Sequence, residues 1–190
     1  LFYQTQLFHP AFEDINVVKV SEGIINFSKQ QNPPAKEMVE AYSEIMEKFQ
    51  AIADAENAEK AKEAGKEGIA FLEENAKKEG ISVTESGLQY EVIEAGEGDK
   101  PTAENEVTVD YEGTTIDGKV FDSSYARGEK ISFGLGQVMK GWTEGLQLMS
   151  PGAKYKFYIP QELAYGERGA GADIPAYAAL IFTVELYSFK

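Results

Sequence analysis

Residues 106–122 have the sequence EVTVDYEGTTIDGKVFD, which contains the clearest strand and turn signals of the chain. Apolar and polar residues alternate from Glu106 to Tyr111, which is the period of a half-buried strand. Asp117-Gly118 then marks a tight turn, because these residues readily adopt the positive φ angles of short hairpin loops. The stretch therefore predicts a hairpin whose arms near the turn are Thr114–Ile116 and Lys119–Phe121.

Short strands of the same kind recur from Leu88 to the end of the chain. The further runs with period-two character are Leu88–Glu94, Ile131–Leu135, Lys154–Ile159 and Leu180–Tyr187. One helical pattern interrupts them, with apolar residues at Val138, Met139, Trp142, Leu146 and Met149. About five antiparallel strands and one short helix predict an α+β domain, in which a half-barrel sheet wraps around the helix.

The first 80 residues have a helical character instead. Apolar residues follow helical spacing between Phe12 and Ser28, and Asn32-Pro33-Pro34 can end that helix and start the next. From Ala35 to about Lys78 only Gly65 and Gly68 weaken a helix, and neither forbids one. A straight helix of this length would span about 66 Å, at 1.5 Å for each residue.

This long helix changes character along its length. Its first third has an apolar stripe formed by Met38, Tyr42, Ile45, Met46, Phe49 and Ile52. Its middle, Ala53–Lys66, is almost wholly Ala, Glu, Lys and Asp, so we expect a semi-rigid spacer that is polar all round and packed against nothing. We therefore predict a helical region over residues 1–50, a stalk over residues 51–80 and a folded domain over residues 81–190.

The helical region of residues 1–50 is too small to bury much apolar surface by itself. Its stripe would meet a second copy of the chain and form a homodimer; the alternative is packing on the preceding helix alone, and we favour the dimer. The chain begins at Leu1 without methionine, so we expect that a segment was removed. Leu1–His9 has neither the basic start nor the long apolar run of a signal peptide.

Composition excludes several kinds of chemistry. The chain has no cysteine and a single histidine, His9, so thiol nucleophiles, histidine-assisted serine nucleophiles and most transition-metal sites are not expected. Its net charge of −14 argues against binding nucleic acid or anionic lipid. No apolar run approaches the roughly 18 residues of a membrane span. We expect no metal and no cofactor.

Four blocks of sequence, in order, resemble the FK-binding immunophilin (FKBP) family of peptidyl-prolyl cis/trans isomerases over about 100 residues. They are Val109–Gly113 with Val120–Ser124, Gln137–Leu146, Leu163–Gly169 and Leu180–Leu186. The N-terminal helices and the stalk look like the macrophage infectivity potentiator (Mip) branch of bacterial members, which form dimers through that region. The run Pro160–Gly169 is especially close to that branch.

The resemblance implies an aromatic pocket for proline. Residues at matching positions are Tyr111, Phe121, Asp122, Val138, Met139, Trp142, Tyr165, Ile174 and Phe182, with Phe133 and Ile131 beside them. By resemblance, Trp142 forms the floor, and Phe121 and Phe182 form walls. The sequence departs from the eukaryotic pattern at the rim, where Ile131 replaces a phenylalanine and Ala170 a histidine, which affects substrate preference and macrolide affinity. The family also implies inhibition by rapamycin-type macrolides.

The residue chemistry suits prolyl isomerisation, because an apolar pocket favours the twisted, less polar amide over the planar one and needs no nucleophile. We expect the Tyr165 hydroxyl and the Met139 backbone N–H to bind substrate carbonyls. Asp122 would either orient Tyr111 or polarise the substrate carbonyl; followed by two serines, it could also merely cap a turn. Gly166–Gly171 lacks the Gly-Lys-Ser/Thr ending of a phosphate loop, so we read it as a flexible flap.

Two functions remain open at this point. The first is an isomerase that accelerates proline-limited protein folding by binding Xaa-Pro segments. The second is a chaperone or binding module, which can coexist with catalysis. Relatives in this branch occur in the cytoplasm and in the cell envelope, and the missing start favours the periplasm or envelope, although trimming explains it equally well.

Overall fold

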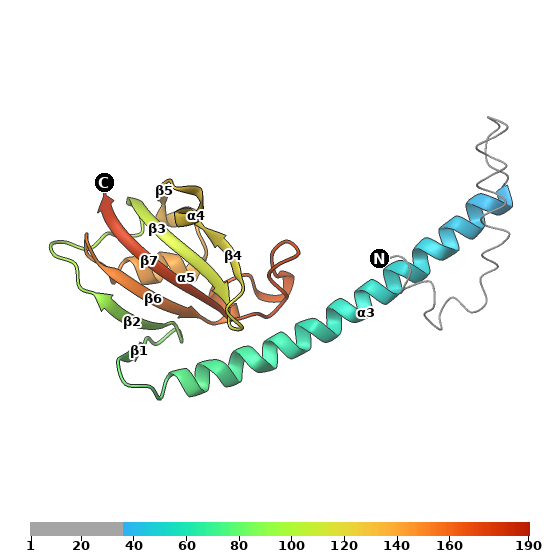
Figure 1. The fold of residues 1–190 in the computed structure, drawn as a ribbon, viewed down its shortest axis with the longest axis horizontal. Helices are drawn as coiled ribbons and strands as arrows, with labels where there is room; N and C mark the ends of the chain where they lie inside the picture. The colour runs from blue at the N-terminus through green and yellow to red at the C-terminus, as the bar shows by residue number, and fades with distance from the viewer. Residues whose placement is uncertain (1–35) are drawn as a thin grey trace. The chain divides into compact units, whose positions relative to one another are not determined.

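The computed structural model describes residues 36–190 (Figure 1). The predicted helix between Phe12 and Ser28, the Asn32-Pro33-Pro34 break, the start of the chain and the side chain of Met38 lie outside the described residues. The chain divides into two compact units, Leu1–Ala58 and Glu59–Lys190. Helix α3, Lys36–Asn75, has residues in both units.

The second unit consists of a curved antiparallel sheet with short helices. Its strands are β1 (Ile81–Val83), β2 (Gln89–Glu94), β3 (Glu106–Thr115), β4 (Val120–Ser123), β5 (Ile131–Gly134), β6 (Lys154–Ile159) and β7 (Leu180–Phe189). Its helices are α4 (Ser124–Arg127) and α5 (Lys140–Leu146), with 3₁₀ turns η2 (Leu135–Gln137), η3 (Gln161–Leu163) and η4 (Gly166–Arg168). The strand order is β1-β2-β6-β7-β3-β4, and β5 pairs with β3. The predicted α+β fold is confirmed; β4 corresponds to the predicted hairpin arm Lys119–Phe121, and the three-residue β1 was not predicted.

The predicted turn at Asp117-Gly118 joins β3 to β4. Gly118 has a φ of +86°, and its N–H donates to the carbonyl of Thr115 over 2.9 Å. The Thr115 N–H in turn donates to the carbonyl of Lys119 over 3.0 Å, so three residues form the loop. This loop is one residue longer than a two-residue turn, and β4 consequently begins at Val120.

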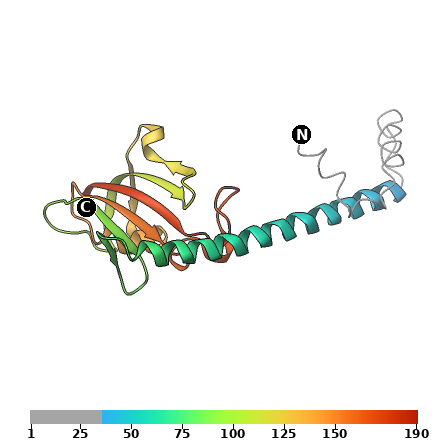
Figure 2. The same cartoon turned by 60° about the horizontal axis from the view of Figure 1, so that its bottom comes forward.

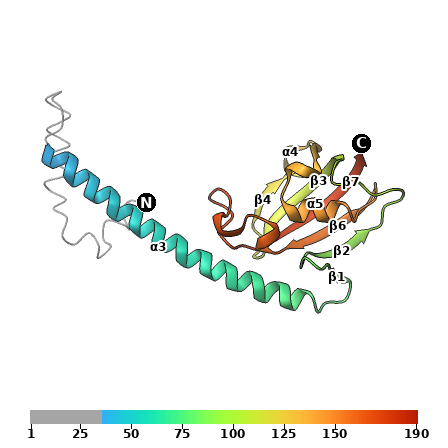
Figure 3. The same cartoon turned by 180° about the vertical axis from the view of Figure 1, so that it is seen from behind.

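Helix α5 lies against the inner face of the sheet, as Figure 3 shows from behind. Two glycines on one side of α5 allow this approach. A Cβ at Gly141 would lie 2.5 Å from Ile159 Cγ2, and one at Gly145 would lie 2.7 Å from Phe157 Cε1. Any larger residue would push α5 off β6, because the interior is already close-packed. The close approach places Trp142 deep in the core.

The last turns of α3 pack against part of the other face of the sheet, beside β2 and β6 (Figure 2). Ala61 and Gly68 are buried, and the Phe71 ring lies 6.0 Å from the Tyr158 ring of β6. The buried Asn75 amide donates to Gln89 of β2 over 2.9 Å. The prediction that Ala53–Lys66 packs against nothing is therefore wrong from Ala61 onward, because alanine and glycine are small enough for a helix to approach a sheet even without large apolar residues.

Candidate active site

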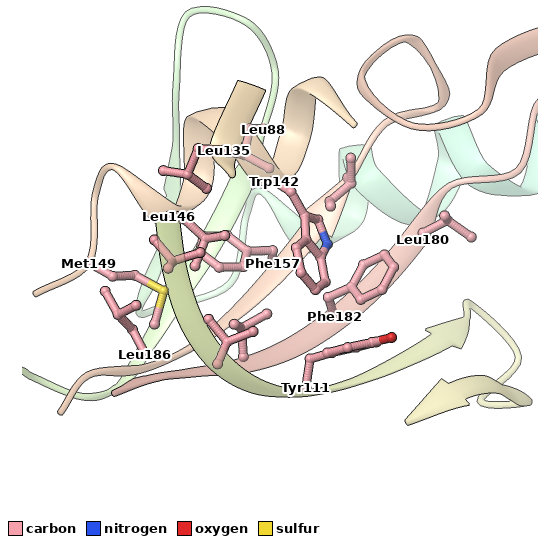
Figure 4. Close-up of a cluster of buried hydrophobic side chains, with 14 of the residues drawn as sticks. Leu88, Tyr111, Leu135, Trp142, Leu146, Met149, Phe157, Leu180, Phe182 and Leu186 are labelled. Atoms are coloured by element: carbon pink, nitrogen blue, oxygen red, sulfur yellow. The ribbon is translucent and has the colours of Figure 1, made fainter. Parts of the chain in front are cut away.

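Five aromatic rings from five different elements meet at one end of the core. We call Tyr111 (β3), Phe121 (β4), Phe133 (β5), Trp142 (α5) and Phe182 (β7) the aromatic cluster. The ring of Trp142 lies 4.9 Å from Tyr111, 5.3 Å from Phe133 and 5.2 Å from Phe182, measured between centroids. Phe121 contacts Phe182 edge to face, at 5.5 Å. Figure 4 shows Trp142, Phe182 and Tyr111 together, while Met149 and Leu186 lie toward the other end of the core.

Trp142 is the centre of this cluster and is only 5% exposed. Its backbone N–H donates to Met139 over 3.0 Å, and the neighbouring Thr143 hydroxyl donates to the Leu135 carbonyl over 2.6 Å, so the start of α5 is held firmly. The indole N–H of Trp142 is buried and has no acceptor within the described part of the chain. Unsatisfied buried donors are rare in folded proteins and tend to mark functional positions.

A glycine lets two of the rings pack on the strand beneath them. A Cβ at Gly113 would lie 2.6 Å from Phe182 Cε1 and 2.7 Å from Phe121 Cζ. Real Cβ atoms essentially never come so close to other atoms, so only glycine fits at this position.

A polar group adjoins the aromatic cluster at Tyr111. The Tyr111 hydroxyl donates to one carboxylate oxygen of Asp122, and Arg127 donates to the other. Arg127 also donates to the Tyr111 hydroxyl oxygen over 3.0 Å, and its guanidinium carbon lies 5.6 Å from the Tyr111 ring centroid. Each member therefore contacts the other two. Arg127 was not predicted, since nothing local ties an arginine to a carboxylate five residues earlier.

Helix α4 brings Arg127 into this group. The Ser123 hydroxyl accepts from the Ala126 N–H at the start of α4, and Gly128, with a φ of +71°, ends it. The Ser124 hydroxyl accepts a hydrogen bond from the Tyr111 backbone N–H over 2.9 Å and donates one to the Asp110 carboxylate over 2.6 Å. Ser123, and not Asp122, therefore caps this turn, while Ser124 ties it to β3.

The charges of this group shift its pKa values in opposite directions. Partial burial works against ionisation of Asp122, but the hydrogen bonds from Tyr111 and Arg127 outweigh it, so the pKa of Asp122 lies below its usual range. Burial and the hydrogen bond to Asp122 raise the pKa of Tyr111. Asp122 is thus ionised and Tyr111 neutral near pH 7, which keeps the Tyr111 hydroxyl a donor.

Removing the Arg127 side chain should weaken the stabilisation of the ionised Asp122 carboxylate. We expect Arg127→Gln to raise the pKa of Asp122 toward its ordinary value of about 3.9. A carboxylate with a lowered pKa stabilises the fold above its unfolded pKa and loses this contribution as the pH falls through the folded value. The variant should therefore be less stable than the parent near neutral pH, and its stability should fall less as the pH is lowered, because Asp122 then has less stabilisation to lose. NMR titration of the Asp122 carboxyl carbon measures the pKa directly.

Lys130→Gln is the matched control, because Lys130 lies 3.2 Å from the Tyr187 ring and takes no part in the Asp122 group. It removes the same charge nearby and should leave the pKa of Asp122 in place. An unchanged Asp122 pKa in Arg127→Gln would contradict the assignment of Arg127.

The remaining predicted site residues lie on the elements around the cluster. Ile131, Phe133, Val138 and Met139 are partly buried against the core, and Ile174 is buried. Tyr165 is 40% exposed, and burial together with the charge of Asp122 raises its pKa, which places it within electrostatic reach of that carboxylate. The Met139 N–H donates no hydrogen bond to any described residue. The roles of these residues remain predictions.

Residues 36–190 contain neither a metal-binding cluster nor a membrane-spanning helix. No three His, Cys, Asp or Glu side chains lie close enough together there to hold a metal ion. No helix in the same part of the chain combines the length and the apolar character needed to cross a membrane.

Comparison with known proteins decides the family. Residues 97–187 match the sequence model of FKBP-type peptidyl-prolyl cis-trans isomerase, and residues 3–92 match the domain amino terminal to it. The chain belongs to the FKBP-type peptidyl-prolyl isomerases. It is therefore an enzyme of that class, as the sequence blocks predicted.

Two bacterial proteins and one solved bacterial structure are similar to this isomerase. It is 46% identical over 183 residues to the FKBP-type 22 kDa peptidyl-prolyl cis-trans isomerase of Escherichia coli, covering 95% of this chain and 87% of that one. It is 45% identical over 155 residues to the outer membrane protein MIP of Legionella longbeachae, covering 80% and 66%. The crystal structure of FkpA from Escherichia coli is similar, with a TM-score of 0.78, 34% identity, and coverage of 100% and 90%. The predicted resemblance to the Mip branch is confirmed.

Proposed function

We propose that this isomerase accelerates proline-limited protein folding by enclosing the Xaa-Pro bond of its substrate in the aromatic cluster. The observation that carries the proposal is the set of contacts around Trp142, whose ring meets three others within 5.3 Å and is almost fully buried. Such a surface fits the apolar face of a proline ring. Proline isomerisation otherwise takes about 10–100 s, slow enough to limit folding.

Desolvation is the proposed source of catalysis. Amide resonance gives the Xaa-Pro bond a rotation barrier of about 18–20 kcal/mol, and the twisted transition state loses that resonance and part of its charge separation. Aromatic walls solvate the planar amide poorly, so they disfavour the ground state more than the twisted form. Phe121, Trp142 and Phe182 would supply the walls and floor, and Val138, Met139, Phe133, Ile131 and Ile174 would surround them.

For Asp122 we propose the orienting role rather than polarisation of the substrate carbonyl. Tyr111 and Arg127 use both carboxylate oxygens, which supports this choice. The arrangement would hold the Tyr111 ring in place against Trp142. The unpaired Met139 N–H and the exposed Tyr165 hydroxyl are proposed to bind the carbonyls of the peptide, which would fix its orientation.

Peptide isomerisation tests the proposed mechanism. The cis-to-trans rate of an Ala-Xaa-Pro-Phe peptide should rise with enzyme concentration, and a rapamycin-type macrolide should inhibit it by competing for the aromatic cluster. Refolding of a protein limited by proline isomerisation should respond in the same way. Peptide turnover that a bound macrolide leaves unaffected would contradict the placement of the site.

A homodimer with chaperone-like binding is the proposed second activity. Val39, Tyr42 and Met46 are spaced along one face of α3 and are 52%, 62% and 48% exposed, which supports an apolar surface for a second copy. Two sites held in one dimer would bind an unfolded chain at two points, which raises effective concentration. We further propose the periplasm or cell envelope as its location, which the name of the Legionella relative supports.

Charged residues on this face should break the dimer. We expect Tyr42→Glu combined with Met46→Glu to give a monomer, measured by light scattering after size exclusion. Burying a neutral polar group without a hydrogen bond costs about 2–7 kcal/mol, and burying an unpaired carboxylate costs more. Ser43→Glu, on another side of the same turn, is the control and should leave the dimer intact. A parent protein that is monomeric at micromolar concentration would refute the dimer.

A further inference from the structure

The segment from Tyr165 to Ala179, here called the flap segment, contains two of the predicted site residues, Tyr165 and Ile174. Ala170 and Ile174 exchange two backbone hydrogen bonds, of 2.9 and 3.1 Å, which form a small hairpin. At the base, the Tyr177 N–H donates to the Gly166 carbonyl over 2.8 Å. The hairpin is thus one connected piece, and the position of Ile174 depends on where the base is held.

Tyr177 has an unfavourable backbone conformation. Its φ of +62° makes it the one non-glycine residue with positive φ in the described range 36–190. This region is unusual for a residue with a large side chain, since Cβ crowds the following carbonyl. Such a conformation persists when surrounding contacts determine it, and it is found preferentially at functional positions.

Helix α3 supplies those contacts. A Cβ at Gly65 would lie 3.3 Å from Tyr177 Cβ, and a Cβ at Gly68 would lie 3.1 Å from Ala179 Cβ. Glycine inside a helix lowers its stability, so two such residues in adjacent turns need a reason. The reason is the close approach of the flap base, which lies in the same compact unit as α3 from Glu59 onward.

Open space lies on both sides of this contact. A cavity of about 300 Å³ is bordered by Lys62, Pro160 and Tyr177, and another of about 290 Å³ by Glu67, Asp117 and Asp173. Near the tip, Asp173 pairs with Lys119 over 2.6 Å, but both side chains are more than half exposed, and such pairs contribute little. The flap segment can therefore shift sideways unless α3 holds its base.

We propose that Tyr177 is a positioning residue: α3 holds it at Gly65, and it thereby places Tyr165 and Ile174 for substrate binding. This makes the last turns of α3 a working part of the isomerase. The inference rests on the proposed function, because it takes Tyr165 and Ile174 to contact the peptide.

Tyr177→Asn separates positioning from stability in the full chain. Asparagine tolerates positive φ but lacks the ring of Tyr177, whose Cγ lies 4.0 Å from the place of a Cβ at Gly65. We expect KM for the Ala-Xaa-Pro-Phe peptide to rise about tenfold with kcat nearly unchanged, because the substrate must then order the flap segment itself. The Ala170 and Ile174 amides should exchange hydrogen faster, while the melting temperature stays equal or rises. Tyr177→Phe, which keeps the ring, should match the parent.

A change on the helix side gives an independent test. Gly65→Leu places a Cβ 3.3 Å from Tyr177 Cβ, with a larger side chain beyond it, and so pushes the flap base away without altering the flap sequence. It should reproduce the KM and exchange changes. Ala70→Leu, at an exposed position of α3, is the matched control and should change neither.

Two results would overturn the inference: unchanged exchange at Ala170 and Ile174 in both variants, or activity that falls only in proportion to stability. Failure of the proposed function is recognised separately, as an absence of macrolide-sensitive peptide turnover in the parent protein. Hydrogen exchange needs no substrate, so it tests whether α3 anchors the flap segment even if the parent protein shows no peptide turnover.

Discussion

The Trp142→Ala variant is expected to lower kcat/KM for an Ala-Xaa-Pro-Phe peptide by about tenfold to a hundredfold, which corresponds to about 1.4–2.7 kcal/mol of transition-state stabilisation. The reason is the position of the ring, which contacts Tyr111, Phe133 and Phe182 at once. Its loss would let water reach the amide and remove the surface against which proline packs. Stopped-flow or coupled-protease assays of the cis-to-trans rate measure the effect.

Stability must be controlled in this experiment, because removing a buried tryptophan costs about 3–5 kcal/mol. Trp142→Leu retains more of the volume and should fold better while still losing activity. Leu186→Ala creates a cavity in the same core, but Leu186 lies toward the other end from Phe182 in Figure 4 and should leave kcat/KM unchanged. Near-normal turnover in a folded Trp142→Leu protein would refute the aromatic cluster as the site.

The second large effect is expected from a single added methyl group at Gly113. Alanine there would place Cβ 2.6 Å from Phe182 and 2.7 Å from Phe121, and Phe182 is buried on all sides. The rings must move, so we expect a loss of about 1–3 kcal/mol in the free energy of unfolding. Because both rings belong to the aromatic cluster, kcat/KM should also fall about tenfold, or 1.4 kcal/mol. Urea unfolding and the peptide assay measure the two effects.

Gly134→Ala provides the comparison, since it also adds a methyl group to a strand glycine of the same sheet. The nearest atom to a Cβ there is Gln137 Cδ, at 3.9 Å, which is an ordinary contact distance. This variant should be as stable and as active as the parent. If Gly113→Ala behaved in the same way, the close packing of Phe121 and Phe182 on β3 would be wrong.

The elements that carry the site could be predicted from local signals, and the site residues on them from the resemblance of short sequence blocks to the FKBP family. The alternation in β3 and β7 places Tyr111 and Phe182 on the inner face, and the helical period of α5 does the same for Trp142. The hairpin turn at Gly118 likewise depends only on residues next to it. These elements formed where the pattern indicated, although the roles of their side chains await the experiments above.

Other parts of the site depend on contacts between distant segments. Arg127 acquires meaning only when α4 folds back so that its guanidinium reaches both Asp122 and Tyr111. Gly65 looked like a weak point in a helix, and its contact with Tyr177 appears only once α3 lies on the sheet. The polar middle of α3 was misread for the same reason, because small residues give no apolar signal in the sequence.

The sequence by itself determined the FKBP family, the antiparallel sheet around one helix, and the aromatic residues of the cluster. The sheet and the helix follow from period and turn chemistry, which are local properties of the chain. The family and the cluster residues follow from the resemblance of four ordered blocks of sequence. The tertiary structure alone decided that five rings meet at Trp142, that Arg127 completes the Asp122 group, and that α3 supports the flap segment. Those are steric and electrostatic contacts across the fold, which no local pattern encodes.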